Sequence, residues 1–167
     1  MRLLHARPPH NFAGVFESDW RKARVAVLPV PYDGTASWKS GARNGPAAII
    51  EASRNMEWFD EELGEEIAQK IGFFTLEELE PDAGGPEETV ARVEEAVKEI
   101  LEAKKLPVIL GGEHSITVGV LRALAERDKG FSVLALDAHA DLRGEYEGSP
   151  FSHACAMRRA REIIGGA

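Results

Sequence analysis

The sequence has a single cysteine, no long apolar run and no excess of basic residues. Because Cys155 stands alone among 167 residues, no disulfide can form within the chain, and a reducing cytoplasm is the expected location. No stretch approaches the roughly 18 apolar residues of a membrane span, and residues 1–12 lack the apolar centre of a signal peptide. The formal net charge of −8 argues against nucleic acid or an anionic membrane as partner, since both bind to basic surfaces.

What the sequence does contain is enough apolar material for one core. Of its residues, 44% are hydrophobic and 29% are charged, a balance typical of globular proteins. A chain of this length suits one ordinary domain, and no low-complexity linker or internal repeat divides it. We therefore expect a single α/β domain over residues 1–167.

Apolar runs and helical patterns alternate along the chain. The clearest helix is predicted over 84–105, with acids in its first turn and Lys104 and Lys105 in its last. Its apolar stripe consists of Val90, Val93, Val97, Ile100 and Leu101. Buried strands are predicted over 24–30, 106–112 and 131–137, a short strand within 70–76, and further helices over 46–56, 115–127 and 149–164. The alternation predicts a three-layer α/β/α arrangement with a parallel sheet covered on both faces.

Polar motifs follow two of these predicted strands. "GGEHS" (111–115) follows one, and "LDAHADL" (136–142) ends the other. Ligands of parallel sheets bind beyond the carboxyl ends of the strands. If the chain stays extended, Asp137, His139 and Asp141 project to one side, because strand side chains alternate, and a histidine in the first motif could reach the same point. Oxygen and imidazole ligands without a thiolate favour Mn²⁺, Fe²⁺ or Zn²⁺; the alternative is that these residues are polar caps on a loop.

These motifs, with "SHACAMRRA" (152–160) and the early "PYDGTASWKSGARNGPAAIIEAS" (31–53), resemble the ureohydrolases of the arginase and agmatinase family, and agmatinases most. The likeness extends over nearly the whole chain. It implies an arginase-like fold, and hydrolysis of a small cationic guanidino substrate by a hydroxide held between two Mn²⁺ ions. Agmatine is the expected substrate, giving putrescine and urea in polyamine biosynthesis. Arginine or another guanidino or formimino compound is the alternative within this class.

The same resemblance assigns roles to individual residues. It implies that His114 binds one ion, His139 binds the other and Asp137 bridges them. Asp141 would bind the first ion and accept a hydrogen bond from the hydroxide. His153 would shuttle protons or contact the substrate, so Asp141 and His153 are the catalytic candidates. Members of the family usually assemble from several subunits, which implies a homo-oligomer.

Elementary chemistry agrees with these roles. Metal ions lower the pKa of bound water and so supply a nucleophile strong enough for a guanidinium carbon. The departing amine needs a general acid, a role that suits His153; otherwise this residue is an ordinary histidine on a helix surface. Glu145 and Glu147 would repel a substrate carboxylate, which favours agmatine over arginine. We expect a supporting role for Glu113, and expect Cys155 to be a small buried hydrophobe.

One family motif, S-x-D-x-D-x-x-D-P, does not occur in the 167 residues. Two divalent ions need about ten to twelve ligand positions, whereas two histidines and two aspartates supply about six. We therefore expect the N-terminal portion of a ureohydrolase domain, ending before the C-terminal strands, with open strand edges and little or no activity alone. Two other hypotheses are a non-catalytic metal-binding or interaction module, and a single-zinc deacetylase. One ion would not need both His114 and Asp141, which argues against the deacetylase.

Overall fold

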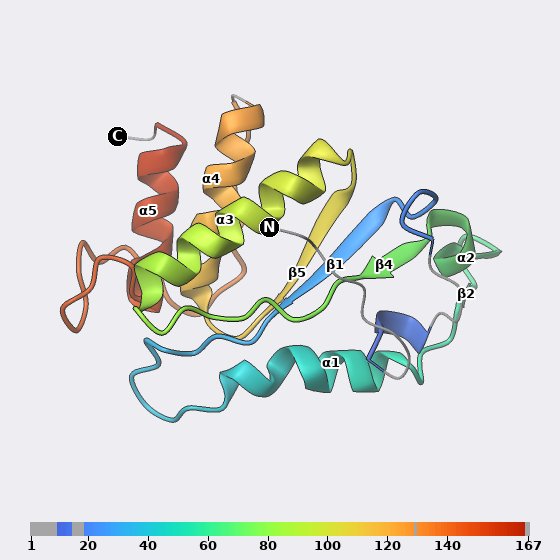
Figure 1. Ribbon diagram of the computed structural model, residues 1–167, viewed down its shortest axis with the longest axis horizontal. Helices are drawn as coiled ribbons and strands as arrows, with labels where there is room; N and C mark the ends of the chain where they lie inside the picture. The colour runs from blue at the N-terminus through green and yellow to red at the C-terminus, as the bar shows by residue number, and fades with distance from the viewer. Residues whose placement is uncertain (1–9, 15–18, 129, 166–167) are drawn as a thin grey trace.

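A parallel β-sheet forms the centre of the protein in a computed structural model, which describes residues 10–14, 19–128 and 130–165. Its strands run in the order β4-β1-β5 (Figure 1). β1 pairs in parallel with both neighbours, so that Val25 lies opposite Phe73 on one side and Leu106 on the other. The strands are β1 (Val25–Val30), β4 (Phe73–Thr75) and β5 (Leu106–Gly111), with a separate antiparallel pair of β2 (Phe59–Asp60) and β3 (Glu65–Glu66).

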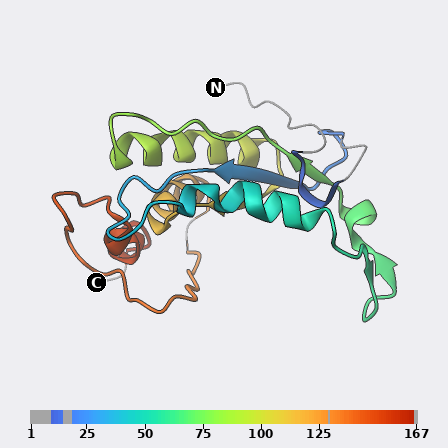
Figure 2. The same ribbon diagram turned by 90° about the horizontal axis from the view of Figure 1, so that it is seen from below.

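Helices cover both faces of this sheet. α1 lies against one face, while α3 covers the other face with α4 beside it, and α5 packs on α4 (Figure 2). The predicted α/β/α layering is therefore confirmed. The helices are α1 (Gly45–Ser53), α2 (Ile67–Ile71), α3 (Pro86–Glu102), α4 (Thr117–Arg127) and α5 (Ala156–Ile163), with short 3-10 turns at Phe12–Gly14, Ala42–Asn44, His114–Ile116 and His153–Cys155. Among the described residues, no helix has the length and apolar character needed to cross a membrane.

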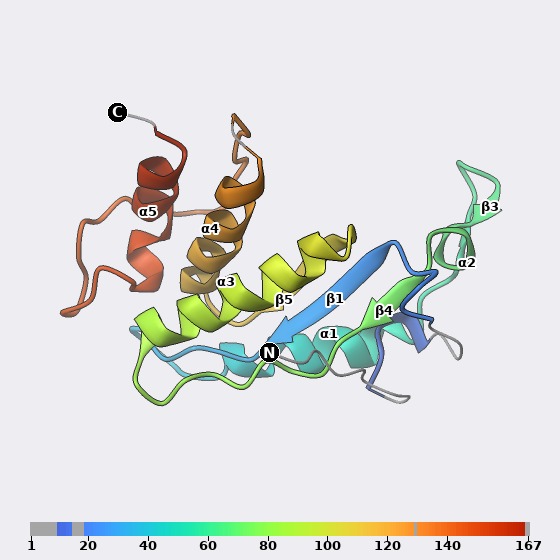
Figure 3. The ribbon, with the colours of Figure 1, turned by 45° about the horizontal axis from the view of Figure 1, so that its top comes forward.

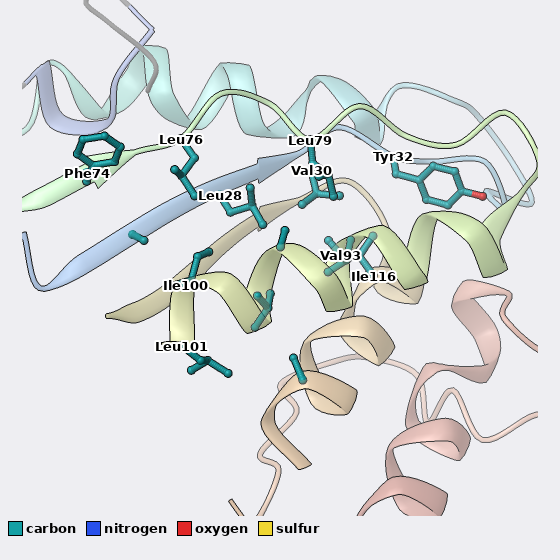
Figure 4. Packing of buried hydrophobic residues seen from close by; sticks show 14 of the residues in the cluster. Leu28, Val30, Tyr32, Phe74, Leu76, Leu79, Val93, Ile100, Leu101 and Ile116 are labelled. Carbon is teal, nitrogen blue, oxygen red and sulfur yellow. The ribbon is translucent and has the colours of Figure 1, made fainter. Parts of the chain in front are cut away.

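The main core lies between β1 and α3. All six residues of β1 are buried, and Leu28 and Val30 pack toward the apolar stripe of α3 (Figure 4). Within this stripe, Val93 and Ile100 are completely buried, which confirms the predicted helix face. Removing each such side chain from water contributes roughly 1.5–3 kcal/mol, so the packing of α3 on β1 stabilises the fold.

The two lysines predicted in the last turn of this helix lie beyond its end. Lys104 has a φ of 58°, a left-handed backbone conformation that cannot continue a helix. The chain then turns back, and Lys105 is buried, with its Nζ donating a hydrogen bond to the carbonyl of Ala23 at 2.6 Å. The same ammonium lies 4.3 Å from the centre of the Trp20 ring. This basic residue therefore joins the end of α3 to the start of the sheet.

The prediction of a strand over 131–137 is wrong. This segment has no regular secondary structure, no other described residue pairs with it, and it runs apart from the sheet (Figure 2). Its Leu134 and Leu136 are 85% and 92% exposed.

β5 is also not fully buried, since Leu106 and Val108 are 62% and 37% exposed. β1 pairs with one edge of β5, and no described residue pairs with the other edge (Figure 3). A buried strand needs hydrogen-bonding neighbours on its edges and a cover on its faces. Among the described residues, the edge partners and the cover are both incomplete for β5.

The helix predicted over 149–164 begins later than expected. Tyr146 and Ser149 exchange two backbone hydrogen bonds of 3.1 Å, which makes a tight turn before the segment. Pro150 lies in the exposed turn that follows, rather than at the start of a helix, and α5 begins only at Ala156. As a result, His153 lies in a short 3-10 turn at the end of a loop.

Candidate metal centre and its cleft

His114 reaches the candidate site through a tight connection after β5. The strand ends at Gly111, and His114 begins the 3-10 turn that leads into α4. At Gly112, a Cβ atom would lie 2.1 Å from the carbonyl oxygen of Tyr32, so no larger residue fits. This close approach of two backbones places the imidazole of His114 just beyond the carboxyl end of the sheet, where ligands of parallel sheets bind.

Two aspartates of the "LDAHADL" segment meet this histidine. The Nδ1 atom of His114 lies 2.7 Å from Asp141 Oδ2 and 3.4 Å from Asp137 Oδ2. One ligand atom from each of the three residues lies within 4.8 Å of the others. Asp141 has a φ of 47°, which aspartate tolerates better than most residues. The structure therefore brings together three of the four predicted metal ligands.

His139 lies outside this cluster. Its side chain is 83% exposed, and its Nδ1 atom is 3.7 Å from Asp137 Oδ1. The chain bends at residues 138–139 instead of staying extended, and the backbone N–H of His139 donates to Asp137 Oδ1 at 2.8 Å. The strand-like alternation assumed from the sequence is therefore absent, and metal binding by His139 stays a prediction.

The charge of the cluster suits one divalent cation. The hydrogen bond from the backbone of His139, aided by the nearby charges of His114 and His139, lowers the pKa of Asp137 below its ordinary value. Its carboxylate therefore stays negative at neutral pH. Two carboxylates and one imidazole are donors that Mn²⁺ accepts, and two negative charges balance one divalent ion. The three residues thus fit one ion, whereas a second ion would require further ligands.

An open cleft of about 910 Å³ surrounds the cluster. His153 and Tyr146 line it together with the three cluster residues, as does Trp38, whose side chain is among the most exposed apolar groups. The ring of Tyr146 lies edge-on to that of His153, with 5.9 Å between the centroids. His153, predicted from the sequence as a proton carrier, therefore shares the cleft with the candidate ligands.

The loop after β1 forms one wall of this cleft and is held by Asp33. Asp33 Oδ2 accepts a hydrogen bond from the backbone N–H of Gly41 at 2.6 Å, and Oδ1 accepts one from Nε of Arg43 at 2.5 Å. Pairing with Arg43 is the main reason that the pKa of Asp33 falls from 3.8 to about 2. These contacts close the loop around residues 36–39, which line the cleft.

Glu113 and Cys155 have the supporting positions expected for them. The carboxylate of Glu113 accepts hydrogen bonds from the backbone and hydroxyl of Thr35 and from the hydroxyl of Ser115. Cys155 is buried, and this burial raises the pKa of its thiol. Neither residue is placed to attack a substrate, because one is occupied by hydrogen bonds and the other is buried.

Sequence reasoning missed part of the cleft. Trp38 and Tyr146 line it, whereas Glu145 and Glu147, which were expected near the substrate, are not among its lining residues. Thr35 was also missed, although it contacts His153 across 118 positions of sequence. The motif that contains Thr35 was visible, but no local pattern links it to a histidine so far away.

Comparison with known proteins identifies the family. The sequence profile of the Arginase family matches residues 23–166. The chain belongs to the arginase family. Among curated arginase-family proteins, it is 38% identical over 151 residues to the N(1)-aminopropylagmatine ureohydrolase of Synechocystis, covering 87% of this chain and 49% of that protein. It is 35% identical over 147 residues to the agmatinase of Bacillus subtilis, covering 88% and 50%.

A solved structure confirms the arginase-like fold. The chain matches the agmatine ureohydrolase of Thermoplasma volcanium with a TM-score of 0.77 and 32% identity, covering 89% of this chain and 49% of that one. The chain therefore spans about half the length of the arginase-family relatives that it matches.

Proposed function

We propose that this chain supplies the metal-binding half of a ureohydrolase active site that converts agmatine into putrescine and urea, with Mn²⁺ as the resident ion. The observation that carries the proposal is the convergence of His114, Asp137 and Asp141 within 4.8 Å, in a cleft that His153 also lines. The ureohydrolase names of the relatives support the same chemistry. Such a reaction belongs to polyamine biosynthesis in the cytoplasm.

Each cleft residue has a role in this proposal. His114, Asp137 and Asp141 would hold the first ion, and His139, which lines the same cleft, would contribute to a second ion together with carboxylates from outside these 167 residues. When bound, Mn²⁺ supplies a strong nucleophile at neutral pH by lowering the pKa of water. Asp141 would hold the ion and would accept a hydrogen bond from the attacking water.

His153 handles the proton of the leaving group. Addition of water to the guanidinium carbon must be followed by cleavage of its bond to the alkylamine nitrogen, which needs a proton to leave. His153 lies in the cleft, and a histidine can donate this proton near neutral pH. A general acid of this kind contributes typically 10²–10⁴-fold to the rate.

The shape of the cleft allows a longer substrate as a second candidate. The cleft is open, and the indole of Trp38 is 87% exposed at its margin. An aromatic face attracts an alkylammonium group by cation–π interaction. N(1)-aminopropylagmatine, named for one of the relatives, has an additional ammonium that could reach this indole.

A non-catalytic metal-binding or interaction module is the alternative function. The specific observation in its favour is the edge of β5 that pairs with no described residue, together with the exposed Leu134 and Leu136. Such an edge binds other polypeptide strands, including a second copy of this chain in a homo-oligomer. Metal binding without turnover would then be the whole activity of the cleft.

Titration with Mn²⁺, followed by the electron paramagnetic resonance signal of the free ion, tests the site. We expect one ion per chain, and a loss of affinity of at least tenfold in Asp141→Asn, since it removes a ligand. Glu145→Gln is the matched control, because Glu145 lies on the same loop outside the cleft lining. Equal binding by both variants would contradict the site.

Urea release from agmatine, N(1)-aminopropylagmatine and arginine tests the reaction. We expect little urea from the chain alone, and turnover of agmatine after mixing with the half of Bacillus subtilis agmatinase that this chain does not match. Rapid turnover by the chain alone would show that the added half is unnecessary. Mn²⁺ binding without urea in any mixture would instead support the non-catalytic module.

A further inference from the structure

The hydroxyl of Thr35 has three hydrogen-bonding neighbours. Its Oγ1 atom lies 2.5 Å from Glu113 Oε1, 2.9 Å from the backbone nitrogen of His153 and 3.2 Å from Nδ1 of the same histidine. A threonine hydroxyl has one hydrogen to donate and two lone pairs to accept with. The three neighbours therefore use the one hydrogen and both lone pairs of the hydroxyl, and each contact can be assigned to one of them.

The assignment follows from the chemistry of the neighbours. A carboxylate can only accept, so the hydrogen of Thr35 Oγ1 points to Glu113. A backbone N–H can only donate, so His153 N occupies one lone pair. The remaining lone pair faces Nδ1 of His153, and two acceptors would repel each other there. Nδ1 must therefore carry a hydrogen.

We propose that Thr35 is a positioning residue that holds the neutral His153 imidazole in its Nδ1–H tautomer and leaves Nε2 as the nitrogen that exchanges protons. Among the described residues, only the Nδ1 side of this ring has hydrogen-bond partners. Proton transfer at Nε2 rests on the proposed function, whereas the tautomer rests on the hydrogen bonds alone. A hydrogen bond to one ring nitrogen sets the role of the other.

Glu113 prevents the hydroxyl of Thr35 from rotating to another arrangement. Its two carboxylate oxygens hold both the backbone N–H and the hydroxyl of Thr35, at 2.8 and 2.5 Å. The hydroxyl of Ser115 donates to the same carboxylate at 2.6 Å, which fixes its orientation in turn. The expected support by Glu113 therefore passes through Thr35 to His153.

Ser152 is the competing partner. Its Oγ atom lies 3.4 Å from Nδ1 of His153, farther than Thr35 at 3.2 Å. If Ser152 donated to this nitrogen, the lone pair of Nδ1 would face that of the Thr35 oxygen. The geometry therefore favours Thr35 as the residue that sets the tautomer, and Ser152 serves as the control.

Nuclear magnetic resonance of the ring nitrogens measures the tautomer directly. Long-range ¹H–¹⁵N correlation spectra would be recorded on the intact chain at about pH 8.5, where an ordinary histidine is neutral, with His153 assigned by the loss of its signals in His153→Gln. We expect the Nδ1–H pattern, opposite to the Nε2–H form that free histidine prefers. An Nε2–H pattern in the unmodified chain would overturn the proposal.

Three substitutions then test the cause. Thr35→Val keeps the shape but removes the hydroxyl, so we expect His153 to shift to Nε2–H, whereas Thr35→Ser and Ser152→Ala should keep Nδ1–H. Backbone amide spectra check that each variant is folded. An unchanged tautomer in Thr35→Val, or its loss in Ser152→Ala alone, would assign the effect elsewhere.

A kinetic readout separates this inference from the proposed function. If the completed enzyme releases urea, Thr35→Val should lower kcat about 10–100-fold, part of the contribution of a general acid, with little change in KM and rescue in Thr35→Ser. If no urea is released, the reaction fails while the spectra still confirm or overturn the tautomer.

Discussion

Two apolar runs of similar composition have opposite fates in this molecule. "VAVLPV" (25–30) forms β1, in which every residue is buried, whereas "FSVLAL" (131–136) forms no strand. β1 has a strand on each edge and a helix layer on each face. The second run has no paired neighbour among the described residues, and its two leucines point into solvent. The difference teaches that neighbours, more than composition, make an apolar run into a strand.

β5 is intermediate between these two cases. Its backbone pairs with β1 along all six residues, yet nothing in the described part of the chain pairs with its far edge, and its first residue, Leu106, is mostly exposed. The candidate metal centre lies where β5 and the unpaired run approach each other at their carboxyl ends, through His114 and Asp137. The candidate site therefore lies between the central sheet and the exposed segment 131–136.

The largest expected effect is on stability. Leu28→Ala in β1 should lower the free energy of unfolding by about 3 kcal/mol, because it leaves a cavity in a packed core. Leu136→Ala should change it by less than about 0.5 kcal/mol, since the exposed side chain loses no packing. Urea denaturation of both variants measures the contrast. Equal losses would mean that the 131–136 run is packed after all.

Metal binding should give the second-largest effect, by stabilising residues 137–141 much more than β1. With Mn²⁺ at 100 times its dissociation constant, opening of residues 137–141 should cost about 2.7 kcal/mol more, because the ion must first be released. Hydrogen exchange measured by mass spectrometry should therefore slow about 100-fold in 137–141 and little in β1. Asp137→Asn should abolish this slowing, whereas Asp128→Asn, outside the cluster, should not. Uniform slowing over the whole chain would contradict a local site.

Acid should open the loop held by Asp33 before it unfolds β1. The pKa of Asp33 is lowered from 3.8 to about 2, so its stabilising contribution is complete above pH 3.8 and is lost as the pH falls toward 2. Asp33→Asn should destabilise the protein by about 2 kcal/mol at neutral pH, the value of a charge-assisted hydrogen bond. It should also flatten the dependence of stability on pH in this window. An Asp33→Asn variant with the same acid profile as the unmodified chain would rule out this role.

The smallest expected effect on stability concerns the exposed leucines. Leu134→Lys with Leu136→Lys should change the free energy of unfolding by less than about 0.5 kcal/mol, but should reduce self-association and binding of the unmatched half of Bacillus subtilis agmatinase. Lysines keep strand edges from pairing with other chains. Sedimentation velocity measures this change, with Leu63→Lys as a control on another exposed leucine. An equal reduction by the control would make the effect one of general solubility.

Much of the fold could be predicted from local pattern. The stripe of α3 repeats at helical spacing, and each of its residues is buried as predicted. The proline at the start of α1 also marked its helix correctly. These features depend on contacts between near neighbours or on one well-matched face, which periodicity reports directly.

The site could be predicted only in part. Residue type and family resemblance identified His114, Asp137 and Asp141, which the structure brings together. The same reasoning assumed an extended chain through His139, and a bend at residues 138–139 turned this side chain to solvent. It also passed over Thr35, because the contact with His153 comes from two loops far apart in the sequence.

The amino-acid sequence by itself determined the family, the α/β class and the kinds of ligand atom available, since motifs and periodicity are local properties. Only the tertiary structure decided which apolar runs became strands and which ligands converged, and it alone supplies the contacts from which the tautomer of His153 is inferred. The physical reason is that pairing, burial and hydrogen-bond saturation depend on groups supplied by distant segments. A local stretch of sequence does not show which distant residues will pack against it.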